Sequence, residues 1–182
     1  IEEKNCWNMS ILSADFSYSK INFKKLFSPK ECIHSIKNND NEFNAMQSGG
    51  RIISLDNDHI IFSTGEFRSR YLAQNIQSIN GKLIKINIKS SNFKIISSGH
   101  RNVQGLLFDK DEKFLLFTEH GPAGGDEINL LDITKDTISN YGWPISSYGY
   151  HYSDKLDITR NKKYPFLKSH SSYGFIEPLK YF

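Results

Sequence analysis

The sequence lacks the features that mark several common classes of protein. No apolar stretch approaches the ~18 residues that are needed to span a membrane, so no membrane span is expected. Basic and acidic residues are nearly balanced, with 23 Lys and Arg against 20 Asp and Glu and a net charge of +3. These charges are scattered and form no basic stripe, so no nucleic-acid partner is expected.

Cysteine is equally scarce. Cys6 and Cys32 are the two cysteines of the chain, which is too few for a disulfide scaffold. A single bridge between them is expected if the chain folds in an oxidising compartment. Two buried free thiols are the alternative, and the residues alone leave both interpretations open.

Sustained helical spacing is missing as well, and a short helix or turn is expected only at 71–79. Short apolar runs rich in Ile, Phe, Leu and Tyr recur instead, each bounded by Asn, Asp, Gly or Ser. This pattern predicts β-strands. They are expected at 52–53, 60–62, 82–88, 93–96, 106–108, 114–117 and 128–133. The predicted fold class is therefore all-β.

Two segments of the chain resemble each other. One begins at Gly50 and leads to the apolar run at 60–65, and the other begins at Gly105 and leads to 115–119. Their starting points lie 105 − 50 = 55 residues apart, close to the roughly 50 residues of a kelch-type propeller blade. A four-stranded blade exposes two apolar faces and must stack on a neighbour. The repeat therefore predicts a β-propeller, with a β-sandwich as the structural alternative.

Three polar blocks each follow an apolar run. They read GHRNVQGL at 99–106, TEHGPAGGDEIN at 118–129 and NYGWP at 140–144. In this order the blocks resemble the soluble quinoprotein glucose dehydrogenases, also called the glucose/sorbosone dehydrogenase family. The resemblance implies a six-bladed β-propeller that uses pyrroloquinoline quinone (PQQ) and calcium. It is strongest over 47–144, and residues 1–182 are interpreted as part of one such domain, about three blades of a longer protein.

The resemblance also implies which residues form the site. It assigns cofactor binding to Arg101, Asn102, Gln104 and His120, and metal binding to Gly121, Pro122, Glu127 and Tyr141. The carbonyls of Gly121 and Pro122 would hold the calcium beside PQQ, since Ca²⁺ accepts main-chain oxygens. Glu127 and Tyr141 would hold a second, structural calcium. The alternatives are purely structural: Arg101 and Asn102 would donate hydrogen bonds to the carbonyls of a turn, and Glu127 would belong to a solvated acidic turn.

One position departs from the family pattern. Active members of the family have a general-base His four residues before the Arg that matches Arg51, and this chain has Gln47 there. An amide cannot accept a proton near neutral pH, whereas His titrates in the working range. The catalytic residues expected are therefore Arg101, which would stabilise an oxyanion, and Gln47 as an impaired base. The remaining histidines, His34, His59, His151 and His170, are expected at the surface.

The function implied by the resemblance is PQQ- and calcium-dependent oxidation of an aldose. The anomeric hydroxyl would be oxidised by hydride transfer to the quinone. The alternative is a non-catalytic propeller of the same fold that acts as a binding or scaffold module. A hydrolase propeller of the lactonase kind is a third interpretation, for which Glu119 is the one acidic candidate. A small sugar is the expected partner, a homodimer is a further one, and the family implies a periplasmic or secreted location.

Overall fold

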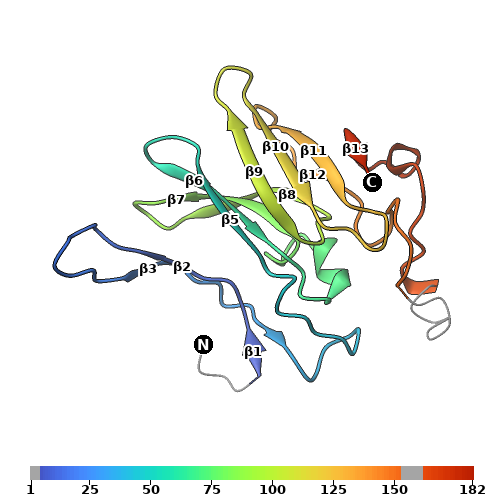
Figure 1. Ribbon diagram of the computed structural model, residues 1–182, viewed down its shortest axis with the longest axis horizontal. Coiled ribbons are helices and arrows are strands. Elements are labelled where there is room, and N and C mark those ends of the chain that lie inside the picture. The colour runs from blue at the N-terminus through green and yellow to red at the C-terminus, as the bar shows by residue number, and fades with distance from the viewer. Residues whose placement is uncertain (1–4, 153–161) are drawn as a thin grey trace.

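The computed structural model describes residues 5–152 and 162–182, and these residues form an almost entirely β fold (Figure 1). The larger sheet has the strand order β12-β8-β7-β6-β5. Its strands are β5 (Gly49–Ser54), β6 (His59–Thr64), β7 (Lys82–Asn87), β8 (Phe93–Ser98) and β12 (Ser139–Asn140). All neighbours in this sheet are antiparallel except β12, which runs parallel to β8.

The second sheet has four antiparallel strands in the order β13-β11-β10-β9. They are β9 (Val103–Asp109), β10 (Phe114–Glu119), β11 (Glu127–Asp132) and β13 (Lys180–Tyr181). The strands β6 and β10 begin 114 − 59 = 55 residues apart, the same separation as the repeat in the sequence. The repeat therefore corresponds to equivalent hairpins of the two sheets.

The main core lies between these two sheets. It is built from apolar side chains that alternate along the facing strands, because successive residues of a strand point to opposite faces. Its buried members are Ile61, Leu83, Val103, Leu115, Phe117, Leu131 and Tyr141. Burial of such side chains contributes about 1.5–3 kcal/mol each, so the stacking of the sheets stabilises both.

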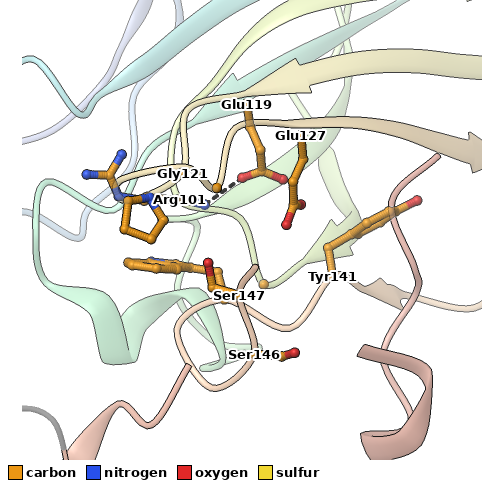
Figure 2. Close-up of a pocket in the computed structure, with 11 residues that line it drawn as sticks. Arg101, Glu119, Gly121, Glu127, Tyr141, Ser146 and Ser147 are labelled. Carbon is orange, nitrogen blue, oxygen red and sulfur yellow. Dashed lines mark hydrogen bonds between the residues drawn. The ribbon is translucent and has the colours of Figure 1, made fainter. Parts of the chain in front are cut away.

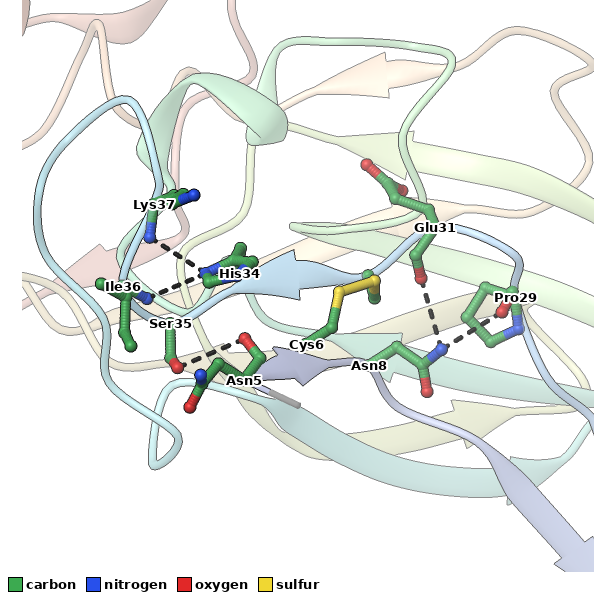
Figure 3. Close-up of a disulfide and its surroundings, with 10 residues drawn as sticks. Asn5, Cys6, Asn8, Pro29, Glu31, His34, Ser35, Ile36 and Lys37 are labelled. Atoms are coloured by element: carbon green, nitrogen blue, oxygen red, sulfur yellow. Dashed lines mark hydrogen bonds between the residues drawn. A yellow bond between two sulfur atoms is a disulfide. The ribbon is translucent and has the colours of Figure 1, made fainter. Parts of the chain in front are cut away.

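The N-terminal segment forms two short antiparallel pairs. β1 (Cys6–Trp7) pairs with β4 (Ile33–His34), and β2 (Ile11–Ser13) pairs with β3 (Lys24–Phe27). A disulfide joins Cys6 to Cys32 with a Cα–Cα distance of 5.5 Å (Figure 3). Beside it, Asn8 Nδ2 donates to the carbonyls of Pro29 and Glu31 at 3.2 and 3.3 Å. The disulfide interpretation is confirmed over the two free thiols.

Helical structure in the described residues includes two short 3-10 turns, η1 (Arg70–Ala73) and η2 (His170–Tyr173). The first overlaps the region at 71–79 where a short helix or turn is expected. A fully buried lysine, Lys82, holds η1 against the start of β7: its Nζ donates to the carbonyls of Leu72, Ala73 and Asn80, each at 2.8 Å. Burial lowers the pKa of Lys82 to about 7.

The chain segments that precede β5 and β9 are fastened together at one end of the two sheets. Asn102 Oδ1 accepts from the Gly49 N–H at 2.9 Å, and Asn102 Nδ2 donates to the Met46 carbonyl at 3.4 Å. The Glu66 N–H, just after β6, donates to the Arg101 carbonyl at 3.2 Å. These bonds bring residues around 47, 66 and 101 to the same end of the fold.

Candidate functional site

The three polar blocks of the sequence converge on one small cavity, as the resemblance predicts. The cavity leaves about 10 Å³ for the centre of a water-sized sphere, which is about enough for one water molecule or ion. Its lining residues are Gly99, Arg101, Glu119, Gly121, Pro122, Gly125, Glu127, Tyr141, Trp143, Ser146 and Ser147. Figure 2 shows the carboxylates of Glu119 and Glu127 side by side at this cavity.

Glu119, the last residue of β10, is held in a fixed orientation. Its Oε2 accepts from the Arg101 N–H at 2.8 Å, and its Oε1 lies 3.0 Å from His100 Nδ1 and accepts from Asn129 Nδ2 at 3.2 Å. His100 in turn places Nε2 2.7 Å from Ser97 Oγ. This network links the block at 99–106 to the block at 118–129.

Glu127, the first residue of β11, is buried, so it does not belong to a solvated acidic turn. Its Oε2 accepts from Asn129 Nδ2 at 3.2 Å, and its Oε1 lies 3.7 Å from His170 Nε2. Burial, together with the negative charge of Glu119, raises the pKa of Glu127 above its ordinary value. Among the described residues, the buried polar atoms without a hydrogen-bond partner include Asn129 Oδ1, an acceptor outside the cavity lining, and Trp143 Nε1, a donor whose residue lines the cavity.

His170 is not at the surface, and that prediction is wrong. Its side chain is 1% exposed, stacks on Tyr148 with 5.0 Å between ring centroids, and its burial lowers its pKa. The reason is that the segment around η2 packs back on the four-stranded sheet, where β13 pairs with β11. Nothing in the local sequence of His170 indicates that long-range contact.

The Gly121–Pro122 turn is closed by a bond from the Gly125 N–H to the Pro122 carbonyl at 2.9 Å. A Cβ atom on Gly121 would lie 1.7 Å from the Gly125 carbonyl oxygen, so only glycine fits at this position. Tyr141 presents its ring to the cavity, but its hydroxyl points away (Figure 2) and donates to the Leu130 carbonyl at 2.6 Å. The Tyr141 hydroxyl is therefore already engaged.

A larger cavity of about 190 Å³ adjoins the small one. Its lining residues are Glu42, Arg68, Arg70, Arg101, Pro122, Trp143, His151, Tyr152 and Phe166. Arg101 belongs to both cavities: its Nη1 donates to the His120 carbonyl at 2.9 Å, and its guanidinium carbon lies 5.5 Å from the centre of the Trp143 ring. Burial lowers the pKa of Arg101.

Gln47 lies in contact with Arg101, so the structure brings the two predicted catalytic residues together. With its amide oriented to match donors with acceptors, Gln47 accepts from Arg101 Nη2 at 2.9 Å and from Arg68 Nε at 3.3 Å. Its nitrogen donates to Glu66 Oε1 at 2.6 Å. Glu66 is fully buried, its Oε2 has no partner within residues 5–152 and 162–182, and desolvation raises its pKa to about 7. Sequence reasoning missed Glu66, although a polar residue directly after a strand end was the signal available.

The other predicted cofactor-binding residues lie elsewhere or are already engaged. Asn102 uses both amide groups on backbone atoms of 46 and 49. Gln104 and His120 line a separate depression of about 250 Å³, together with Asp126 and Phe182. The His120 ring is exposed, with Nδ1 3.4 Å from Asp126 Oδ2. The structure therefore groups Gln104 with His120 and apart from the Gln47–Arg101 contact.

No group of three or more His, Cys, Asp or Glu side chains in the described residues has the arrangement of a metal site. A cation at the small cavity would thus need backbone oxygens in addition to Glu119 and Glu127. Across the same described residues, no helix has both the length and the apolar character required to cross a membrane.

Comparison with known proteins supplies the family. A model of the Glucose / Sorbosone dehydrogenase family matches residues 20–175. Aldose sugar dehydrogenase YliI of Escherichia coli (strain K12) is 35% identical over 118 residues, which are 58% of this chain and 31% of that protein. Quinoprotein glucose dehydrogenase B of Acinetobacter calcoaceticus is 40% identical over 90 residues, 41% of this chain and 18% of that protein.

Two solved structures share the fold of this chain over nearly its whole length. The soluble aldose sugar dehydrogenase of Escherichia coli in the apo-form has a TM-score of 0.70 and 26% identity, and the match covers 96% of this chain and 49% of that one. The PQQ-bound aldose sugar dehydrogenase of Streptomyces coelicolor has a TM-score of 0.63 and 20% identity, covering 96% and 46%, and supports the fold alone. The prediction of an all-β portion of a six-bladed β-propeller is confirmed. The chain spans about a third of the length of two of the curated relatives that it matches.

Proposed function

The chain belongs to the Glucose / Sorbosone dehydrogenase family, and on that premise we propose that the protein carrying it is a PQQ- and calcium-dependent oxidoreductase of aldose sugars. The observation that carries the proposal is the meeting of Arg101, Gln47 and the Gly121–Pro122 turn around two adjoining cavities. The proposal extends to the whole protein, of which residues 1–182 would form part of a single domain with its main match at 47–144.

The small cavity has the chemistry that calcium requires. The buried carboxylates of Glu119 and Glu127 line a space of about 10 Å³ together with the Gly121–Pro122 turn. Calcium binds six to eight oxygens, including main-chain carbonyls and water. The resemblance implies two calcium ions, one on Gly121 and Pro122 and a second on Glu127 and Tyr141. Because all four residues line this one small cavity, we propose a single calcium held by their oxygens. Tyr141 would contribute its carbonyl, because its hydroxyl is engaged with Leu130.

The larger cavity has the chemistry that a planar, acidic cofactor requires. Rings of Trp143, Tyr152 and Phe166 line it together with arginine side chains, and arginine offers planar, charged donors to carboxylates and carbonyls. When bound, PQQ would accept the hydride of the sugar, and calcium would act as a Lewis acid beside it. The separate depression with Gln104 and His120 is the less favoured location for the cofactor because it lacks these arginines.

The residues of this chain would bind and orient the sugar. Arg101 is fixed by the His120 carbonyl, by Trp143 and by Gln47, so its guanidinium can stabilise negative charge on a sugar oxygen without rearrangement. Gln47 can accept or donate a hydrogen bond but cannot remove a proton. The wild-type protein would therefore bind sugar and quinone but oxidise the sugar slowly.

A specific observation favours the second candidate function, a non-catalytic binding module. The amide of Gln47 is engaged by Arg101, Arg68 and Glu66, as expected of a structural residue. In the same context we propose a periplasmic or secreted location, which the Cys6–Cys32 disulfide supports because such bonds persist in oxidising compartments.

The test is titration of the full-length protein with PQQ, with and without Ca²⁺, followed by the absorbance of the quinone. Calcium-dependent binding is expected, and Glu127→Gln should weaken the calcium effect. Asp136→Asn is the matched control, because it removes an exposed carboxylate that pairs with Lys94 on the surface. Absence of PQQ binding at saturating Ca²⁺ would reject the oxidoreductase and leave the binding module.

A further inference from the structure

The larger cavity carries more positive charge than a neutral sugar requires. Three guanidinium groups, those of Arg68, Arg70 and Arg101, line it against a single carboxylate, that of Glu42. The resemblance accounts for Arg101 alone, and Arg68 and Arg70 lie outside the three polar blocks. Their presence in the cavity needs a separate explanation.

The three arginines are held as one array by two shared acceptors. Arg68 Nη1 and Arg70 Nη2 donate to the same oxygen of Glu42, at 3.3 and 2.9 Å. Arg68 Nε and Arg101 Nη2 donate to the same oxygen of Gln47, at 3.3 and 2.9 Å. Arg68 therefore stands between the other two, and its planar group is oriented before any ligand arrives.

The backbone at Arg68 is unusual. Phe67 and Arg68 both have positive φ angles, 53° and 66°, a conformation that is uncommon for residues other than glycine. Phe67 is buried and stacks on Phe43 with 5.9 Å between ring centroids, which holds the turn in place. Strain of this kind persists where the surrounding structure fixes it, commonly at ligand sites.

The arginines differ in how far they are committed. The Arg70 side chain is 11% exposed, and its backbone N–H donates to Asp40 Oδ2 at 2.8 Å. Asp40 is itself occupied by Lys163 Nζ at 2.7 Å and by the Tyr164 hydroxyl at 2.6 Å. The Arg68 side chain is 35% exposed. Arg68 is therefore the guanidinium of this array that is most accessible to a ligand.

The lining of the larger cavity also includes aromatic rings. Trp143 and Phe166 pack against each other with 5.1 Å between centroids, and Tyr152 lies in the same lining. Rings of sugars and planar cofactors stack on aromatic side chains, while a carboxylate on such a ring would meet the arginines. A carboxylate accepts two parallel hydrogen bonds from a guanidinium, which is among the stronger polar contacts in proteins.

We propose that Arg68, supported by Arg70 and Arg101, is a carboxylate-binding residue of this cavity, and that the ligand is a ring compound that bears a carboxylate. The inference rests on the proposed function, since the ligand would occupy the same site. Two sources share this chemistry: an acidic sugar such as a uronic acid, and the tricarboxylic quinone PQQ.

The experiment measures binding by calorimetry on the full-length protein, with D-glucuronate, D-glucose and PQQ as separate probes. Arg68→Gln should weaken binding of the carboxylate-bearing source by about tenfold to a hundredfold, the range expected for loss of a charge-assisted hydrogen bond. Arg68→Lys keeps the charge but not the planar fork, and should show an intermediate loss. Lys89→Gln is the control, because it removes one positive charge at the exposed Asp58 pair.

Each outcome has a defined meaning. A loss for D-glucuronate with PQQ binding unchanged identifies an acidic sugar as the ligand, and the reverse identifies the quinone. If neither probe binds more weakly to Arg68→Gln than to Lys89→Gln, with both variants folded by thermal melting, the carboxylate site is rejected. Because each probe is measured separately, an absence of PQQ binding at saturating Ca²⁺ would reject the proposed function while leaving the effect of Arg68→Gln on D-glucuronate to decide this inference.

Discussion

The two adjoining cavities differ in the sign of their charge. The small cavity is lined by the carboxylates of Glu119 and Glu127, and the larger one by three guanidinium groups, those of Arg68, Arg70 and Arg101, against the one carboxylate of Glu42. Arg101 separates them, with its N–H on Glu119 and its side chain in the larger cavity. A cation and an anionic ligand could therefore lie side by side without either charge being left uncompensated.

We expect the largest effect on the two cavities from removal of the Glu119 carboxylate. Glu119→Ala would leave His100, Asn129 and the Arg101 N–H without their shared acceptor. Removing one partner of a buried pair costs about 3–5 kcal/mol, and we expect a loss of that order in the free energy of unfolding. Urea denaturation measures it, with Glu112→Ala, at an exposed turn position, as the control. A loss no greater than that of the control would show that Glu119 does not hold the two cavities together.

The disulfide offers a comparison with a region remote from both cavities. Cys6→Ser together with Cys32→Ser should lower the free energy of unfolding by about 2–4 kcal/mol, because a cross-link restricts the unfolded chain. Binding of Ca²⁺ and of PQQ should be unchanged at temperatures where the protein stays folded. A change in ligand affinity in the folded double variant would contradict the assignment of a purely structural role.

A smaller effect separates the two carboxylates by pH. The folded-state pKa of Glu127 is raised above the unfolded value near 4.5, so its contribution to stability is present below about pH 4.5 and is lost as pH rises through the raised pKa. Glu66, raised to about 7, adds to the same loss. Glu127→Gln should therefore reduce, but not abolish, the fall in melting temperature between about pH 5 and pH 8 without calcium. The corresponding difference in the free energy of unfolding is on the order of 1–2 kcal/mol.

Calcium supplies the control for that measurement. In the wild type at about pH 8, added Ca²⁺ should restore the melting temperature, because a bound cation favours the ionised carboxylate. In Glu127→Gln the same addition should have little effect. An equal rise in both proteins would place the cation away from Glu127.

Sequence reasoning predicted the strands and the meeting of the three blocks, because apolar runs and the polar residues at their ends are local features. Through the family resemblance it also named Gln47 and Arg101 as catalytic residues, and the structure brings these two side chains into contact. It missed Glu66, Arg68 and His170, whose roles depend on contacts with distant segments. The Glu66 carboxylate accepts from Gln47, and the Glu66 N–H donates to the Arg101 carbonyl. Arg68 donates to both Glu42 and Gln47. His170 is buried by the packing of η2. No local spacing in the chain encodes those three contacts.

The central claim is that this site retains the residues that bind cofactor and metal, Arg101 and the Gly121–Pro122 turn, but lacks a proton acceptor at position 47. The most direct test compares oxidation of aldoses by wild type, Gln47→His and Gln47→Ala in the full-length protein loaded with PQQ and Ca²⁺. We predict slow or absent turnover in the wild type and a rise of at least about tenfold in Gln47→His, a conservative part of the general-base range. Fast wild-type turnover that persists in Gln47→Ala would contradict the claim and place the base elsewhere.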